Sequence, residues 1–256
     1  MTGPRPDSDL DLVHVWIAHT TRDQRAVARE LLVAAGAALL RRPKHTITVG
    51  RLQSGQPWLR AGAETALQVS VSHCREAVVV AASRRHPVGV DIESRRAASI
   101  LGPSNATSLR LAERWFDPTE LAWLRQAPPA SRGDAFLMLW TAKEAVGKAL
   151  GIGLRHAGLR RAMPLPELNG PAAEPRGGHA PAWLSGSSPA VRLRGVPDHA
   201  GLLVGHPAPQ ADAVLAVALF GSPDTPITVI EPVAHDRALR SDSGLRANLP
   251  VVVRGN

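Results

Sequence analysis

Lysine, cysteine and tyrosine are scarce in this sequence. Of its 30 basic residues only three are Lys, and the chain holds a single Cys and no Tyr. The lone Cys74 excludes a disulfide within the chain and suits a reducing compartment. Aromatic residues make up 4% of the chain, which disfavours a nucleic-acid-binding protein that stacks bases on aromatic rings.

Long apolar runs are missing as well. The longest, residues 26–40, is interrupted by Arg29 and Glu30 and is too short to span a bilayer. Residues 1–16 lack the basic flank and apolar run that mark a signal peptide. We therefore expect a cytoplasmic protein without a membrane partner.

Arginine, by contrast, is abundant and gives the chain a net charge of +8. This charge favours an acidic partner, whether nucleic acid, an anionic membrane, a phosphorylated ligand or an acidic protein, and does not choose among them. Apolar residues form 44% of the sequence, enough for a sizeable core. The 256 residues accommodate one large domain or two small ones.

Hydrophobic periodicity predicts short strands that alternate with helices. Helical spacing predicts helices over residues 22–42, 106–116, 118–126 and 133–151. Short β-rich runs predict strands over residues 12–18, 45–52, 67–74, 76–83, 87–94, 190–196, 200–206, 213–220 and 226–232. The third predicted helix has a clear start signal, with Asp117 as N-cap and Pro118 at the first helical position. Glu120 at the third position completes a capping box with Asp117, which explains Glu120 without any catalytic role.

Each half of the chain thus combines a small sheet with helical material. We predict an α+β fold of two pseudo-symmetric lobes, each a small antiparallel sheet packed with a long helix, with the active site in the cleft between them. The lobes are assigned to residues 1–102 and 103–233, followed by a loose tail over 234–256. Residues 163–189 are rich in Pro, Gly, Ala and Ser and predict a mobile loop. Because one chain holds both lobes, we expect a monomer.

The segment LWTAKEAVGKALGIGL (139–154) holds two of the three lysines. At about 100° per residue, one helix face presents Trp140, Lys143, Glu144, Gly147 and Lys148, and the opposite face is apolar. On this face the Glu144 carboxylate lies between two lysine ammonium groups. Gly147 has no side chain and would leave room for a ligand to approach the backbone. The alternative is a solvated face with an ordinary Glu144–Lys148 pair.

Two carboxylates stand side by side in VGVDIES (88–94). Strand alternation puts Asp91 and Glu93 on one face and Val90 and Ile92 on the other. Paired carboxylates are typical ligands of Mg²⁺, and a solvent-facing strand edge is the alternative. Glu144 would supply a third carboxylate if the two segments meet.

For two further features the sequence allows either a structural role or a ligand-binding role. The Ser72 and His73 pair ends a predicted strand, where such side chains hold phosphate, although a lone His is more often structural. Arg25 and Arg29 lie near one face of the first predicted helix, either as a solvated basic face or as a phosphate grip. The neighbouring Cys74 lacks the partners of a thiol nucleophile.

Together these motifs resemble the 4′-phosphopantetheinyl transferase family, in its long, single-chain Sfp-type branch. The resemblance is carried by GVDIE (89–93), WFDPTE (115–120) and WTAKEAVGKALGIGL (140–154), with SGQPWL (54–59) and SVSH (70–73) before them. It implies transfer of phosphopantetheine from coenzyme A to a serine of an acidic acyl or peptidyl carrier protein, with release of adenosine 3′,5′-bisphosphate.

The resemblance also implies roles for particular residues. Asp91, Glu93 and Glu144 would hold Mg²⁺ or Mn²⁺, and Glu144, Lys148 and Asp91 would be catalytic. Contacts to coenzyme A are implied for Arg25, Arg29, Gln56, Pro57, Ser72, His73, Lys143 and Lys148. Glu120 and Trp140 are further candidates at recurring positions.

The chain departs from the family pattern at two places. The segment HTT (19–21) is short where relatives carry basic residues for the 3′-phosphate, and Gln56 stands where Lys is common. The alternatives are therefore a weak or inactive coenzyme A-binding relative or, from another class, an Arg-rich nucleic-acid-binding protein. Retention of the three carboxylates and Lys148 favours the active transferase.

Overall fold

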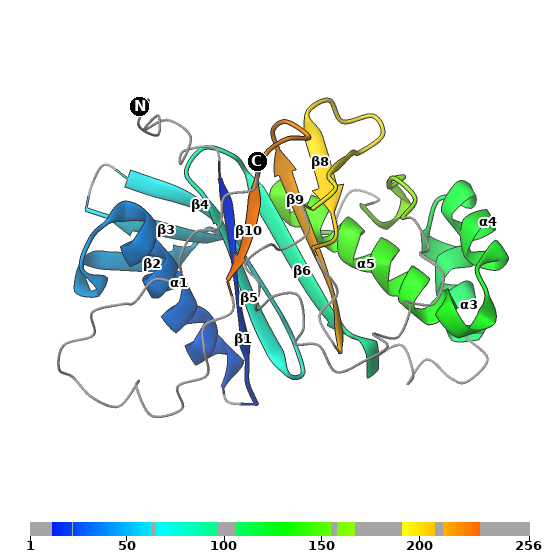
Figure 1. Ribbon diagram of the computed structural model, residues 1–256, viewed down its shortest axis with the longest axis horizontal. Coiled ribbons are helices and arrows are strands. Elements are labelled where there is room, and N and C mark those ends of the chain that lie inside the picture. The colour runs from blue at the N-terminus through cyan, green and yellow to red at the C-terminus, as the bar shows by residue number, and fades with distance from the viewer. Residues whose placement is uncertain are drawn as a thin grey trace, which may run out of the picture.

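The computed structural model of the chain describes residues 12–21, 23–62, 65–96, 106–154, 158–166, 191–207 and 212–230. Within these ranges the fold is α+β, which confirms the predicted class, with two sheets and a long helix on each (Figure 1). Most of the predicted loop 163–189 and the whole predicted tail 234–256 lie outside the described residues. None of the described helices is long and apolar enough to cross a bilayer.

The first sheet has six strands in the order β10–β1–β5–β4–β3–β2. Their bounds are β1 Val13–His19, β2 Ile47–Arg51, β3 Pro57–Ala61, β4 Thr65–Cys74, β5 Ala77–Ser83 and β10 Ile227–Ile230. Helix α1 (Gln24–Leu40) begins at the N-cap Asp23 and packs Val27, Leu31 and Ala35 against this sheet. A spacing of four residues places these side chains on one helix face, as the periodicity predicts.

The second sheet has four antiparallel strands in the order β6–β9–β8–β7. They are β6 Val88–Ser94, β7 Arg194–Gly195, β8 Leu202–Gly205 and β9 Ala213–Phe220. Helix α5 (Arg132–Ala149) packs on this sheet, and α3 (Ala106–Trp115) and α4 (Pro118–Gln126) contact α5 in turn. Single 3₁₀ turns lie at η1 Lys44–Thr46, η2 Pro129–Ser131 and η3 Gly158–Arg160.

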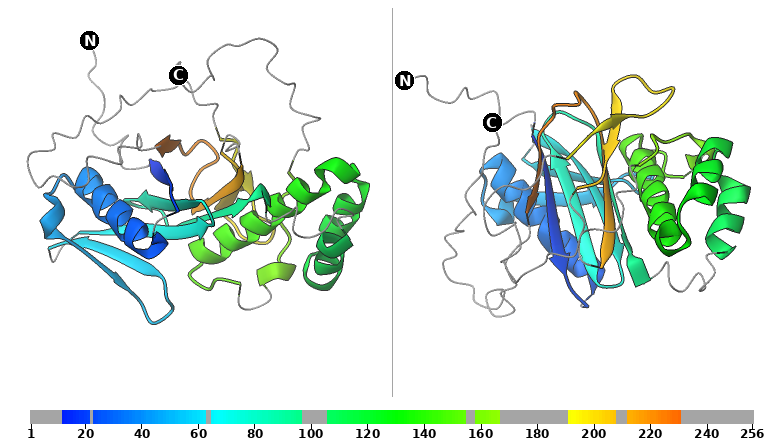
Figure 2. Two further views of the ribbon diagram at one scale, coloured as in Figure 1. Left: turned by 90° about the horizontal axis from the view of Figure 1, so that it is seen from below. Right: turned by 45° about the vertical axis from the view of Figure 1, so that its right-hand side comes forward.

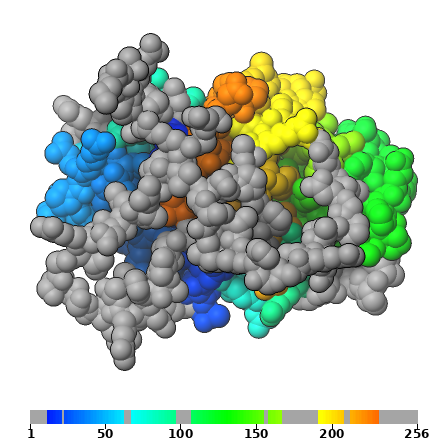
Figure 3. All heavy atoms as spheres, viewed as in Figure 1, coloured from blue at the N-terminus to red at the C-terminus, as the bar shows by residue number. Residues whose placement is uncertain are grey.

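The two sheets pack face to face between the two long helices. In β9, Val214, Ala216 and Ala218 lie in the cluster with α5, whereas Leu215, Val217 and Leu219 lie in the cluster with the first sheet. The layers therefore run α1, first sheet, second sheet, α5 (Figure 2). Figure 3 shows α1 and its neighbouring strands at one end of the molecule and α3 and α4 at the other. Burial on both faces explains why β5 reads as an unbroken apolar run.

The predicted division of the chain at residue 102 does not coincide with the division between the sheets. Strand β6 lies before that point and pairs with β9, whereas β10 lies after it and pairs with β1. The β1–β10 pair is parallel, so the first sheet is not wholly antiparallel as predicted. A pseudo-symmetric two-lobe arrangement stays a prediction. Strand β3 was not expected, because it is short and begins at Pro57, a residue typical of turns.

Gly89 allows β6 to lie directly against α5. A Cβ atom built on Gly89 would stand 1.9 Å from the Ala145 carbonyl oxygen and 2.6 Å from the Ala149 backbone nitrogen. We expect Gly89→Ala to destabilise the fold by about 1–3 kcal/mol or more, because backbone atoms must move apart. Urea unfolding measures this loss. Gly195→Ala is the matched control, since a Cβ there meets nothing within 4 Å, and equal losses for both variants would contradict the prediction.

Candidate active site

Strand β6 presents its two acidic side chains toward helix α5. Val90 and Ile92 lie in the core between the two sheets, as alternation predicts, so Asp91 and Glu93 lie on the opposite face. Lys148 of α5 donates from Nζ to Asp91 Oδ1 at 2.7 Å and to the Val90 carbonyl oxygen at 3.1 Å. The two motifs, 57 residues apart in the chain, therefore meet in space.

Two serines of β4, a strand of the first sheet, form hydrogen bonds with β6. Ser72 donates from Oγ to Asp91 Oδ1 at 2.7 Å, and Ser70 Oγ accepts the Val90 backbone N–H at 3.1 Å. No role was expected for Ser70 from the sequence. The Ser72 hydroxyl therefore orients the Asp91 carboxylate, and the contact of Ser72 with a coenzyme A phosphate stays a prediction.

The protein's own cations and hydrogen-bond donors do not fully offset the negative charge of the three carboxylates Asp91, Glu93 and Glu144. Burial raises the pKa of Glu93 to about 7, with repulsion from Asp91 and Glu144 adding to the shift and Lys148 opposing it. Burial also raises the pKa of Glu144, and the charge of Asp91 adds to that shift. The second oxygen of Asp91, Oδ2, is buried and has no hydrogen-bond partner among the described residues.

These features fit a hard divalent cation. Such an ion takes carboxylate oxygens, relieves repulsion between them and would satisfy an orphan acceptor such as Asp91 Oδ2. In the present arrangement, however, no group of three Asp, Glu, His or Cys side chains in the described part of the chain is close enough to hold a metal ion. The Lys148 ammonium instead supplies the positive charge nearest to Asp91.

Trp140 of α5 supports Glu93. Its side chain forms a hydrogen bond with the Glu93 carboxyl, which opposes the rise in the Glu93 pKa. The indole stacks on Phe136 with ring centroids 6.0 Å apart, and Phe136 stacks on Phe116 at 5.2 Å. The predicted candidate Trp140 thus lies at the carboxylates, held by an aromatic stack.

Lys143 does not stand beside Glu144 on the exposed face, which corrects the expectation from the sequence. Its side chain is completely buried, and Nζ donates to Glu120 Oε1 at 2.8 Å and to the Arg161 carbonyl oxygen at 2.6 Å. Glu120 Oε1 also accepts the Met163 backbone N–H at 2.8 Å. Burial raises the pKa of Glu120 and lowers that of Lys143, while each charge favours the other's ionised form. This pair joins α4, α5 and the segment after η3.

Gly147 also differs from the expectation. A Cβ built there would stand 2.2 Å from the Gly153 carbonyl oxygen, and the Gly147 carbonyl accepts N–H groups from Ile152 and Gly153. The space beside Gly147 is therefore filled by the turn that ends α5 and not by an approaching ligand. This turn has positive φ at Gly151 and Gly153, which favours glycine.

The other predicted contacts to coenzyme A are spread over the first sheet and its helix. Arg25 and Arg29 are exposed on α1, and His73 is exposed on β4. Pro57 opens β3, and the Gln56 amide oxygen lies 3.1 Å from a Cβ built on Gly151, just after α5. The capping box predicted at Asp117 is present, so Glu120 has both a capping contact and the buried pair with Lys143.

Known proteins resemble the part of the chain that carries this site. A family profile described as the 4′-phosphopantetheinyl transferase superfamily matches residues 87–185. The 4′-phosphopantetheinyl transferase gsp of Aneurinibacillus migulanus is 32% identical over 131 residues, 51% of this chain and 49% of that protein. The 4′-phosphopantetheinyl transferase HetI of Nostoc is 34% identical over 92 residues, 36% of each chain.

A shorter relative is covered more fully. The holo-(acyl-carrier-protein) synthase of Cupriavidus taiwanensis is 36% identical over 117 residues, 43% of this chain and 82% of the synthase. The match to gsp, by contrast, spans about half of that transferase. Because the synthase is matched over most of its length and the profile covers both β6 and α5, the chain belongs to the 4′-phosphopantetheinyl transferase superfamily.

Proposed function

We propose that the chain transfers 4′-phosphopantetheine from coenzyme A to a serine of an apo acyl or peptidyl carrier protein. The serine oxygen forms a bond to the phosphorus that bears pantetheine. The bond from that phosphorus to the bridging oxygen breaks, and adenosine 3′,5′-bisphosphate leaves. The observation that carries the proposal is the meeting of Asp91 and Lys148, since it brings the acidic strand and the Lys-Glu helix of the family motif together.

Glu144 is the group to which we assign the serine proton. Burial and the nearby Asp91 charge raise the pKa of this carboxyl, and a more basic carboxylate accepts a proton more readily. Lys148, already 2.7 Å from Asp91, is placed to neutralise charge on the leaving pyrophosphate oxygen. A flexible ammonium stem allows it to exchange the Asp91 oxygen for a ligand oxygen.

Asp91, Glu93 and Glu144 are the proposed ligands of a divalent cation, with Mg²⁺ favoured by their oxygen donors. When bound, the ion would neutralise charge on the pyrophosphate. Ser72 and Trp140 orient Asp91 and Glu93 through the hydrogen bonds described above. Proposed contacts to coenzyme A are Arg25, Arg29, Gln56, Pro57, Ser72, His73 and Lys148. The complete burial of Lys143 favours a structural role for that residue over the contact to coenzyme A that the resemblance implies.

An acidic carrier protein suits the charge of the chain. A net charge of +8 would attract such a partner and speed its encounter with the site. Fatty-acid, polyketide and nonribosomal-peptide carriers all present an acceptor serine, so each is a candidate substrate.

The experiment that tests the proposal is intact mass measurement of apo carrier proteins after incubation with this chain, coenzyme A and Mg²⁺. We expect one carrier to gain the mass of a single phosphopantetheine group. The gain should disappear when the acceptor serine is replaced by Ala and when the metal is chelated. No gain with carriers of all three kinds would overturn the transferase proposal, and retained binding of coenzyme A would then indicate an inactive binding relative.

A further inference from the structure

Strand β6 lies at an edge of the second sheet and pairs with β9 on one side. In an antiparallel ladder, hydrogen-bonded and non-hydrogen-bonded pairs alternate along the strand. Just past the end of β6, the Arg95 N–H donates to the Asp212 carbonyl oxygen, so the bonded pairs fall at every second residue from there, including Asp91. Val90 therefore lies in a non-bonded pair, and its N–H and carbonyl groups point away from β9.

Side chains from two other elements bind these outward backbone groups of Val90. Ser70 Oγ of β4 accepts the Val90 N–H at 3.1 Å, and Lys148 Nζ of α5 donates to the Val90 carbonyl oxygen at 3.1 Å. The next residue is Asp91, whose Oδ1 accepts from Ser72 and from Lys148, each at 2.7 Å. Asp91 is thus held both through its own carboxylate and through the backbone of the residue before it.

The hydrogen bond of Ser70 does not depend on a group that a ligand would also bind. Lys148 holds Asp91 Oδ1, but in the proposed function its ammonium exchanges this oxygen for a ligand oxygen. The Ser70 side chain is buried, and its hydroxyl bonds a backbone N–H that no cation would compete for. The hold of Ser70 on β6 therefore remains when Lys148 moves.

We propose that Ser70 is a positioning residue for the cation site, which fixes the β6 backbone so that Asp91 keeps its place when an ion binds. This inference rests on the proposed function, since it takes Asp91 as a ligand of the divalent cation. Asp91 Oδ2 is buried without a hydrogen-bond partner among the described residues, so the backbone alone determines where this oxygen meets an ion. Removal of a residue that orients a metal ligand typically lowers metal affinity by about 10–100-fold.

The test is titration of the full chain with Mn²⁺, with and without coenzyme A, in which electron paramagnetic resonance measures the free ion. We expect Ser70→Ala to weaken Mn²⁺ binding by about tenfold or more. Ser70→Thr keeps the hydroxyl and should bind Mn²⁺ as the unmodified chain does. Ser83→Ala is the matched control and should also keep its affinity, because Ser83 is a buried serine whose Oγ accepts backbone N–H groups from Arg85 and His86. A Ser70→Thr variant that unfolds at the normal temperature but binds as weakly as Ser70→Ala overturns the proposal.

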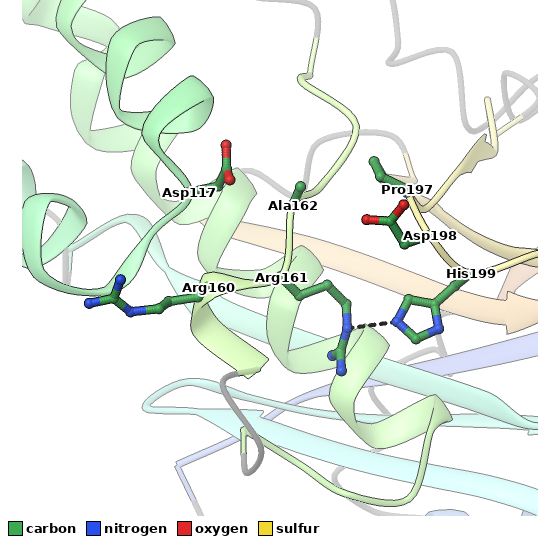
Figure 4. Close-up of a pocket in the computed structure, with 7 residues that line it drawn as sticks. All are labelled: Asp117, Arg160, Arg161, Ala162, Pro197, Asp198 and His199. Atoms are coloured by element: carbon green, nitrogen blue, oxygen red, sulfur yellow. Dashed lines mark hydrogen bonds between the residues drawn. The ribbon is translucent and has the colours of Figure 1, made fainter.

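A second control concerns Mn²⁺ bound elsewhere on the chain. A pocket of about 340 Å³ beside the start of α4 is lined by two carboxylates, Asp117 and Asp198 (Figure 4). Arg161 lines the same pocket, and its positive charge opposes a cation there. Asp198→Asn should therefore bind Mn²⁺ as the unmodified chain does. If Asp198→Asn loses as much affinity as Ser70→Ala, the ion belongs to this pocket and the role of Ser70 is wrong.

Amide hydrogen exchange gives a measurement that needs neither metal nor transfer. The Val90 N–H should exchange faster in Ser70→Ala than in the unmodified chain, while the Asp91 N–H, which bonds within the β6–β9 ladder, stays protected. Equal Val90 exchange or equal Mn²⁺ affinity in the two chains overturns the positioning role and leaves the transferase proposal standing. An unmodified chain that binds no Mn²⁺ overturns the cation site and the role of Ser70 together, whereas the mass gain of the carrier protein decides separately whether transfer occurs.

Discussion

Glu144→Gln should lower the rate of phosphopantetheine transfer by about 10²–10⁴-fold, the usual loss when a general base is removed. The amide has the shape of the carboxyl but accepts no proton and carries no charge to offer a divalent cation. Burial and the Asp91 charge, which raise the pKa of Glu144, are also the features that suit it to take the serine proton. Initial rates with a saturating apo carrier protein, followed by intact mass, measure the loss.

Glu113→Gln is the control for this variant. Glu113 lies on α3 in an exposed pair with Arg125, away from the β6–α5 contact. Its transfer rate should equal that of the unmodified chain, and both variants should unfold at similar temperatures. If Glu144→Gln keeps a rate within about tenfold of the unmodified chain, the proton is accepted elsewhere and the assignment of Glu144 is wrong.

Lys143→Met should destabilise the fold by about 3–5 kcal/mol, because it leaves the Glu120 carboxylate buried without its partner. Lys143 and Glu120 are 0% and 1% exposed and stand 2.7 Å apart. The substitution also removes the donor to the Arg161 carbonyl oxygen. Urea unfolding followed by circular dichroism gives the free energy of unfolding for comparison with the unmodified chain.

Two comparisons separate the buried pair from a general effect of removing a charge. Arg125→Ala breaks an exposed pair and should cost no more than about 1 kcal/mol. The double variant Glu120→Gln with Lys143→Met removes both charges and keeps an amide oxygen for the Met163 N–H. It should be more stable than Lys143→Met alone. A single variant that unfolds within about 1 kcal/mol of the unmodified chain contradicts the structural role of the pair.

Local signals in the sequence were sufficient for most elements and for the two faces of β6. Asp117, Pro118 and Glu120 predicted the start of α4, and the capping box is formed. Period-two alternation in β6 correctly placed Val90 and Ile92 in the core and turned Asp91 toward α5. These predictions hold because both depend only on backbone geometry within a few residues.

The predicted helix face of α5 was too wide to separate its two lysines. At about 100° per residue, Lys143 and Lys148 point about 140° apart on the helix. Each lysine therefore contacts a different element packed against α5. Lys143 meets Glu120, which lies 23 residues earlier on α4, and Lys148 meets Asp91 on β6. Neither partner is visible from the periodicity of α5.

The sequence by itself determined the α+β class, the boundaries of the main helices and strands, and the residue types able to hold a cation and a phosphate. The tertiary structure decided which of these residues meet. It brought Asp91 and Lys148 together, buried Lys143 against Glu120, and filled the space at Gly147 with the backbone of Gly153. Local sequence patterns predict which face of a helix or strand a side chain lies on. Contacts between distant segments form only when sheets and helices pack together.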